Sequence, residues 1–349
     1  MRITMKQIAE KAGVHRSTVD KVLHNRPGVS DPVRARVRAV IEEYGYQPNE
    51  AGIALRMQEK TFRIAVVLMD VDSAEYNRNG IERGLCEYQA YNIRTDYHIL
   101  RFSTPRKMLE VLRDIERNQS ADGVILMPHR AESLTKAVNA LKEAGVPTVL
   151  VNADLPDSEA LRYIGANNRQ SSSLAGRLMG ALTGGRGEIA LITSAIQSEN
   201  NNASVEERER SFREFVTKTY PDLRIAATVE NMESSEITYE KTLRLLRDYP
   251  ELRGIYSTCG GAYKIGEAVE ELGLSGKIVV ITHELYPEIM RLIQRGTITC
   301  TIGSELNNQG FLAAKTLMDA LIFKKQPESR TLYTKSEIIF RENADAAEP

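Results

Sequence analysis

The chain has 349 residues, of which 42% are hydrophobic and 27% are charged, so we expect two or three folded domains and exclude a disordered protein. It contains neither the apolar segment of a secretory signal nor a membrane span, which predicts a cytosolic protein that has no membrane partner. The net charge is −1, but residues 1–60 hold 11 Lys and Arg against 7 Asp and Glu. This basic beginning of an otherwise acidic chain predicts that one segment alone contacts a polyanion.

The first part of the chain, residues 1–48, predicts short capped helices. Thr4 and Gln7 have the spacing of a capping box, in which each side chain bonds to the backbone of the other residue. A first helix therefore starts just after Thr4, and Gly13 permits the left-handed turn that ends it. Residues 16–23 form a second helix, because their apolar members fall on one face.

A third helix should follow the cap at Ser30, with Pro32 in its first turn, and should stop at Gly45. Three short helices with a tight turn between the first two predict an all-α helix-turn-helix domain. The second helix of such a domain can enter the major groove of DNA. From periodicity alone, a small helical cap with a solvated polar face is the alternative.

The run T-x-x-x-I-A-x-x-A-G-V-x-x-S-T-V-x-x-V-L, from Thr4 to Leu23, resembles the LacI family of bacterial transcription regulators, and residues 45–49 (GYQPN) continue the match. The resemblance implies a homodimeric repressor that binds double-stranded operator DNA and is under allosteric control. It implies a hinge helix and linker at residues 49–61, with Leu55 inserted at the minor groove. A plain linker is the alternative. The implied DNA-binding residues are Thr4, His15, Arg16, Ser17, Thr18, Asp20, Lys21, His24, Asn49 and Leu55.

Three of these positions depart from the family pattern. Family members usually carry serine at positions 15 and 20 and arginine at position 21, where this chain has His15, Asp20 and Lys21. Arg16 could pair bidentately with a guanine. Asp20 lies one turn from Arg16, so it either orients that guanidinium or accepts a hydrogen bond from a cytosine amino group. We therefore expect an operator sequence that differs from the common one.

From residue 63 onward, buried strand-like runs alternate with amphipathic helical stretches, which predicts an α/β body with parallel sheets. The strand-like runs lie at 64–69, 123–127, 148–151, 188–193, 254–257 and 277–282. Helices are expected between them, at 107–117, 134–144, 206–218 and 239–247. At least eight strand-helix steps imply two doubly wound sheets, and two such subdomains that face each other enclose a ligand cleft.

The body resembles the periplasmic-sugar-binding-protein fold of the ribose-binding kind over residues 62–343. The matching pieces include DGVI at 122–125, GVPTV at 145–149 and Arg208. This fold crosses three times between its subdomains. The resemblance assigns residues 62–164 plus 304–330 to one subdomain and 165–303 plus 331–343 to the other. Residues 344–349 should form a disordered tail.

A small-molecule effector, which could be a sugar, polyol, sugar acid or sugar phosphate, is expected in the cleft. The resemblance places four residues at ligand positions: Arg208, Glu284, Asn152 and Asn168. Arginine forks and carboxylates suit vicinal hydroxyl groups. Each also has a plain interpretation as a surface charge or a loop cap. The candidate effector-binding residues are Asp70, Tyr76, His129, Arg130, Asn152, Asn168, Arg208, Gly260, Glu284 and Ser304.

Two details bear on the effector. His129 and Arg130 follow a strand at the cleft side and, together with Arg208, could favour an acidic or phosphorylated ligand. The family often has an Asn-Asp pair where Gly260 and its neighbour stand, and glutamine where Ser304 stands. A typical ribose site is therefore not preserved.

The sequence argues against an enzyme. The glycines at 184–187 precede a strand, whereas a dinucleotide-binding loop follows one. Cys259 has no apparent partner base, and the scattered cysteines and histidines predict neither a disulfide framework nor a metal site. We expect no cofactor. A sugar-binding receptor and an α/β enzyme with an accessory helical domain are the alternatives to a transcription regulator.

Overall fold

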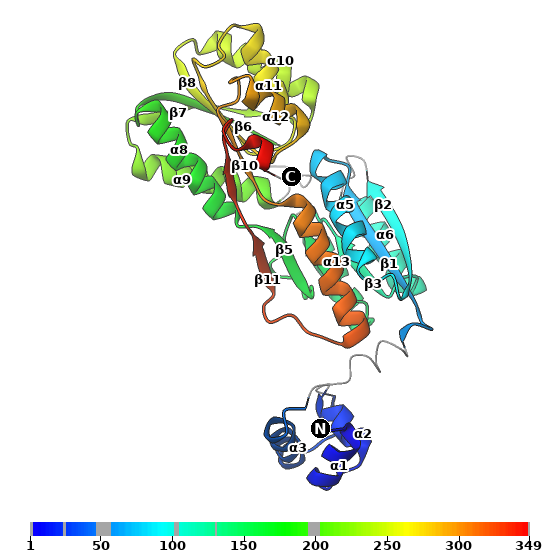
Figure 1. Ribbon diagram of the computed structural model, residues 1–349. Coiled ribbons are helices and arrows are strands. Elements are labelled where there is room, and N and C mark those ends of the chain that lie inside the picture. Colours follow the sequence, from blue (N-terminus) through cyan, green and yellow to red (C-terminus); the bar gives the residue numbers. More distant parts are fainter. Residues whose placement is uncertain are drawn as a thin grey trace. The chain divides into compact units, whose positions relative to one another are not determined.

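The computed structural model describes residues 3–23, 26–46, 57–100, 105–129, 131–194 and 203–347. The chain divides into two compact units (Figure 1): a head that contains residues 1–60, and a body that comprises residues 61–321 and 326–349. Within the described residues, no helix has both the length and the apolar character that crossing a bilayer requires.

The head consists of three helices, α1 (Met5–Ala12), α2 (Arg16–Leu23) and α3 (Asp31–Glu43). The predicted capping box is confirmed, because the Gln7 amide donates to Thr4 Oγ1 at 3.3 Å and the Thr4 amide donates to Gln7 Oε1 at 2.8 Å. Gly13 has the expected left-handed φ of 62°. The three helices share one apolar core, in which Ile8, Val19 and Val37 are fully buried.

The first sheet of the body has the strand order β11-β5-β4-β3-β1-β2, and all neighbouring strands are parallel. Its strands are β1 (Thr61–Met69), β2 (Asn92–Leu100), β3 (Gly123–Leu126), β4 (Thr148–Val151), β5 (Arg162–Ala166) and β11 (Thr331–Thr334). The helices that accompany it are α5 (Asp72–Cys86), α6 (Pro105–Asn118), α7 (Glu132–Glu143) and α13 (Leu306–Phe323). A Cβ atom at Gly80 of α5 would overlap the Asn307 backbone of α13, so glycine permits this close packing.

The second sheet has the order β12-β10-β9-β8-β6-β7, and only β12 runs antiparallel to its neighbour. Its strands are β6 (Gly187–Thr193), β7 (Leu223–Glu230), β8 (Leu252–Ser257), β9 (Val279–His283), β10 (Cys300–Gly303) and β12 (Glu337–Ile339). Its helices are α8 (Asn168–Thr183), α9 (Ala203–Thr219), α10 (Ser235–Asp248), α11 (Tyr263–Glu271) and α12 (Pro287–Gln294). The two parallel sheets with flanking helices match the predicted fold class.

The chain crosses between the sheets after β5, between β10 and β11, and between β11 and β12. One expected boundary is wrong. Residues 331–334 were assigned to the second subdomain, but as β11 they pair with β5 of the first sheet, with Thr331 opposite Tyr163. The last crossing therefore falls between Thr334 and Glu337.

The expected disordered tail also needs correction. Residues Ala344–Ala346 form a short 3-10 helix, labelled η1. Ala344 is fully buried in the core of the second subdomain, and Gln294 Nε2 donates to Asp345 Oδ1 at 2.7 Å. Small apolar side chains within this acidic stretch are sufficient to pack on that core, which its composition did not reveal.

Candidate functional site

A small cavity of about 60 Å³ lies in the body, where loops that follow strands of both sheets meet. Asp72 follows β1, Asn152 follows β4, Glu233 follows β7 and Gly260 follows β8. These positions lie beyond the carboxyl ends of the strands, where doubly wound sheets bind their ligands. The cavity thus occupies the place that the sequence predicted for a cleft.

Arg208 of α9 lies at the centre of this cavity with only 8% of its surface exposed. Its Nη2 donates to Glu284 Oε1 at 2.9 Å, and its Nε donates to Asn168 Oδ1 at 2.9 Å. The remaining Nη1 donates to the Thr258 carbonyl oxygen at 3.3 Å. A buried guanidinium requires such partners, because an unpaired charge there is costly.

Glu284 connects Arg208 to the second crossing between the sheets. Its Oε2 accepts from the Ser304 hydroxyl at 2.8 Å and from the Ser304 amide at 3.2 Å. The Ser304 carbonyl oxygen accepts in turn from Thr334 Oγ1 at 2.8 Å and from Gln309 Nε2 at 2.8 Å. The backbone of Glu284 has a φ of 65°, and that of Asn152 has a φ of 67°.

We call the chain of hydrogen-bonded residues from Asn168 through Arg208, Glu284 and Ser304 to Thr334 the crossing network. Asn168 begins α8 just after the first crossing, Ser304 lies at the second and Thr334 at the third. All five residues are buried. The network therefore ties the cavity to every segment that joins the two subdomains.

Two further carboxylates lie on either side of Gly260. Glu233 Oε2 accepts from the Gly260 amide at 3.0 Å, and Asp72 Oδ2 accepts from the Gly261 amide at 3.4 Å. Desolvation raises the pKa of Glu233, and the neighbouring charge of Asp72 raises it further. A Cβ atom at Gly260 would lie 2.7 Å from Glu233 Oε2. The absence of a side chain at position 260 thus makes room for this acidic pair.

Among the aromatic side chains of this region, Tyr286 lines the cavity. The Tyr76 and Tyr286 rings lie 5.5 Å apart, from elements that belong to different subdomains. The buried Tyr256 hydroxyl lies 2.6 Å from Nε2 of His283, which also lines the cavity. Burial and, to a lesser degree, the Arg208 charge hold the pKa of His283 well below its ordinary value. His283 is therefore a neutral support for its neighbour Glu284.

Of the described candidate effector residues, Asn152, Arg208, Gly260 and Glu284 line the cavity, whereas Asp70, Tyr76, His129, Asn168 and Ser304 do not. Asp70 is exposed, with its amide bonded to the Leu100 carbonyl oxygen at 3.2 Å, and it does not line the cavity. His129 is buried after β3 and is likewise absent from the cavity lining. Arg130 lies outside the described residues. His129 therefore does not join Arg208 in the lining of this cavity, where carboxylate and amide oxygens surround the guanidinium instead.

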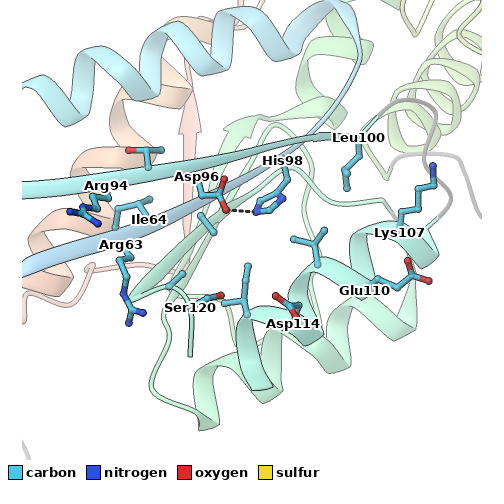
Figure 2. Close-up of a pocket in the computed structure, with 15 residues that line it drawn as sticks. Arg63, Ile64, Arg94, Asp96, His98, Leu100, Lys107, Glu110, Asp114 and Ser120 are labelled. Carbon is cyan, nitrogen blue, oxygen red and sulfur yellow. Dashed lines mark ion pairs between the residues drawn. The ribbon is translucent and has the colours of Figure 1, made fainter. Parts of the chain in front are cut away.

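A larger cavity of about 620 Å³ lies between the edge strand β2 and helix α6 (Figure 2). Both signs of charge line it, and His98 Nε2 pairs with Asp96 Oδ2 at 3.2 Å. None of the candidate effector residues reaches this cavity. Its mixed charges give it no clear preference for a ligand, whereas the polar groups of the smaller cavity converge.

In the head, the candidate DNA-binding residues lie mainly on helix α2. His15, Arg16, Ser17 and Lys21 are exposed, and Thr18 is half-buried. Asp20 Oδ2 accepts from Arg26 Nη1 at 3.2 Å, so an ion pair that the sequence did not suggest partly neutralises it. Thr4 serves as the cap of α1. His24, Asn49 and Leu55 lie outside the described residues.

His15 immediately precedes α2 and caps it. The Ser17 amide donates to His15 Nδ1 at 3.3 Å, and the Ser17 hydroxyl lies 2.9 Å from the same nitrogen. The imidazole ring thus occupies the place that serine or asparagine usually takes at a helix start. Histidine instead of serine at this position therefore preserves the helix cap, but the acceptor is an imidazole nitrogen rather than a hydroxyl oxygen.

Comparisons with known proteins agree on both units. Residues 4–49 match the model of bacterial regulatory proteins of the lacI family, and residues 64–325 match a periplasmic binding protein domain. The transcriptional regulator AglR of Rhizobium meliloti is 25% identical over 354 residues, which cover 99% of this chain and 96% of the relative. The regulator TreR of Salmonella typhimurium is 40% identical over 76 residues, 22% of this chain and 24% of its own.

Solved structures share the fold of the body. A solute-binding protein of Burkholderia graminis, in complex with D-arabinose, has a TM-score of 0.76 at 19% identity and covers 82% of this chain and 98% of its own. A proposed LacI transcriptional regulator from Bacteroides fragilis has a TM-score of 0.74 at 23% identity, covering 83% and 100%. The body therefore has the architecture of sugar-binding proteins of this type.

Proposed function

The chain belongs to the LacI family of bacterial transcription regulators, and from this premise we propose how its two units work together. It is a DNA-binding repressor with a sugar-like effector and not an enzyme. We propose that it acts in the cytoplasm, as a homodimer. One head offers a single recognition helix, whereas a two-fold symmetric operator needs two, one for each half-site.

The exposed residues of α2 are proposed to read the operator. The observation that carries this assignment is the capped helix-turn-helix, whose apolar side chains turn inward while His15, Arg16 and Ser17 remain outside. In a gel-shift selection from random DNA, the full chain should enrich a two-fold symmetric site, and its binding should weaken steeply with salt. If no site is enriched, and if Arg16→Ala behaves like the parent chain, the assignment is wrong.

The effector is proposed to be a neutral sugar or polyol. Three carboxylates, those of Asp72, Glu233 and Glu284, line the cavity against the single guanidinium of Arg208. Carboxylates accept hydrogen bonds from hydroxyl groups, whereas they repel an acidic or phosphorylated ligand. The bound D-arabinose of the Burkholderia graminis protein supports the same class.

A thermal-shift screen tests this ligand class, because a bound ligand stabilises the folded body by mass action. Neutral sugars and polyols should raise the melting temperature, and a matched sugar acid or sugar phosphate should not. An Arg208→Lys variant, which loses the bidentate fork, should lose the response. A shift with the phosphorylated sugar alone would reverse the assignment.

Allosteric control is proposed to pass through the crossing network. Ligand sites in proteins usually measure roughly 300 to 1,000 Å³, whereas the cavity measures about 60 Å³. A sugar must therefore separate the two subdomains and compete with Glu284 for Arg208. Since Ser304 and Thr334 belong to the same network, this change reaches the crossings. We expect the effector to change operator affinity by about 5- to 150-fold, measured by titration with and without it.

A further inference from the structure

The contacts of Ser17 at the start of α2 restrict the hydrogen bonds that its hydroxyl group can make to DNA. Two groups of Ser17 face the same nitrogen, since the amide lies 3.3 Å and the hydroxyl 2.9 Å from His15 Nδ1. Both side chains are exposed on the surface of the head. This pair is distinct from the Asp20–Arg26 ion pair farther along the helix.

The amide donor decides which ring nitrogen carries the proton. A backbone N–H can only donate, so His15 Nδ1 must accept and cannot itself be protonated. In the neutral imidazole the proton then lies on Nε2, which becomes a donor. The Ser17 hydroxyl cannot receive a proton from Nδ1 and therefore donates its own to it.

A hydroxyl group has one hydrogen and two lone pairs, so Ser17 retains only acceptor capacity toward other partners. We propose that His15 is a positioning residue that makes Ser17 an acceptor-only reader of operator bases. Serine without such a partner both donates and accepts and tells bases apart poorly. His15 thereby makes the contact between the Ser17 hydroxyl and DNA selective for bases that donate a hydrogen bond.

The complementary groups on DNA follow directly. In the major groove only adenine and cytosine present an amino donor, at N6 and N4, whereas guanine and thymine present acceptors at the corresponding positions. Phosphate oxygens are acceptors as well, so Ser17 makes no hydrogen bond to the backbone through its hydroxyl. We therefore expect adenine or cytosine opposite Ser17 in each half-site.

This inference rests on the proposed operator binding and is tested with the full chain in the same selection. The position read by Ser17 is the one whose base preference disappears in Ser17→Ala. The parent chain should prefer adenine or cytosine there over guanine or thymine by roughly 5- to 150-fold. Ser17→Ala should leave the salt dependence of binding unchanged, because no phosphate contact is lost.

Two variants of His15 distinguish the loss of the hydrogen-bond acceptor at the helix cap from the loss of the imidazole ring alone. His15→Ala removes the acceptor, frees the Ser17 hydroxyl to donate, and should widen the preference to guanine and thymine. His15→Asn keeps a capping oxygen that accepts from Ser17 and should retain the preference for adenine or cytosine. Binding of both variants to non-specific DNA shows that the head remains folded.

Base analogues provide an independent readout. If the position read by Ser17 is adenine, replacing it with purine, which lacks the N6 amino group, should weaken operator binding by the parent chain by the same factor. Operator binding by the His15→Ala variant should remain nearly unchanged. A parent preference for guanine or thymine, or an unchanged preference in His15→Ala, overturns the inference. If no specific site is found at all, operator binding itself fails, which is a different result.

Discussion

The outward face of α2 and the crossing network of the body use polar side chains in opposite ways. His15 immediately precedes α2, Arg16 and Ser17 lie in its first turn, and all three are exposed. Arg208 and Glu284 are buried, and they come from segments far apart in the chain. Exposed residues that contact DNA bases can be substituted with little effect on folding. Buried residues of the crossing network, in contrast, contribute both to the stability of the fold and to the response to the effector. Substitutions should therefore cost progressively less stability from the body to the head.

The largest effect is expected from Glu284→Gln. It leaves the buried Arg208 guanidinium without its carboxylate, which should lower the free energy of unfolding of the body by about 3 to 5 kcal/mol. Denaturant titration of the body's unfolding transition measures the loss. Glu132→Gln is the matched control, because the Glu132–Lys136 pair is exposed on both sides and should contribute much less to stability than the buried pair. Equal losses of unfolding free energy in the two variants would contradict the expected difference between the buried and the exposed ion pair.

Gly260→Ala should have the next largest effect. The added Cβ atom would lie 2.7 Å from Glu233 Oε2, and because this atom ends a flexible side chain, displacing it should cost only about 1 kcal/mol of body stability. Binding of the neutral sugar found by thermal shift should weaken in parallel. The double variant Gly260→Ala/Glu233→Ala should recover much of the stability, because it removes the clashing group. No recovery would mean that the collision is not with Glu233.

Thr4→Ala tests the head. Loss of the capping hydroxyl should lower the head's unfolding free energy by about 1 kcal/mol, with no change in the transition of the body. Circular dichroism of the full chain during heating separates the two transitions if they differ in midpoint. Thr4→Ser retains a capping oxygen and should behave like the parent chain. A shift of the body transition would contradict the independence of the two units.

Arg16→Ala should have the smallest effect on folding, within about 0.5 kcal/mol, because its side chain is exposed. Operator affinity should nevertheless fall by about 1 to 3 kcal/mol and lose discrimination at one base pair. Arg36→Ala, on an exposed position of α3, controls for the loss of positive charge. If both variants weaken binding uniformly across sequences, Arg16 contacts phosphate rather than a base.

The central strands and the head helices could be predicted because local signals mark them. Strands such as β3 and β4 are fully buried and read as continuous apolar runs, and α1 carries its capping box. The edge strand β2 was missed, since its residues alternate between exposed and half-buried positions and its sequence, NIRTDYHIL, is largely polar. Its pairing with β1 comes from tertiary structure that the local pattern does not contain.

The candidate effector site could be predicted only where the family resemblance supplied positions. The structure brings Arg208, Asn168, Glu284 and Ser304 together, as the resemblance implied. Asp72 and Glu233 were missed, because neither belongs to a motif: Asp72 begins α5, and Glu233 lies in the loop after β7. Their approach depends on the crossings that bring the two subdomains face to face. A search for acids within a few residues of each strand end would have found both.

The left-handed backbone at Asn152 and Glu284 has a consequence for attempts to stabilise this protein. Non-glycine residues in this conformation store roughly 1 to 2 kcal/mol of strain each, least for asparagine. Selection for heat resistance alone would therefore favour glycine at Asn152 but not at Glu284, whose carboxylate pairs with the buried Arg208. Replacing Asn152 would delete a side chain that lines the cavity, so resistance to heat and sensitivity to the effector oppose each other at this residue.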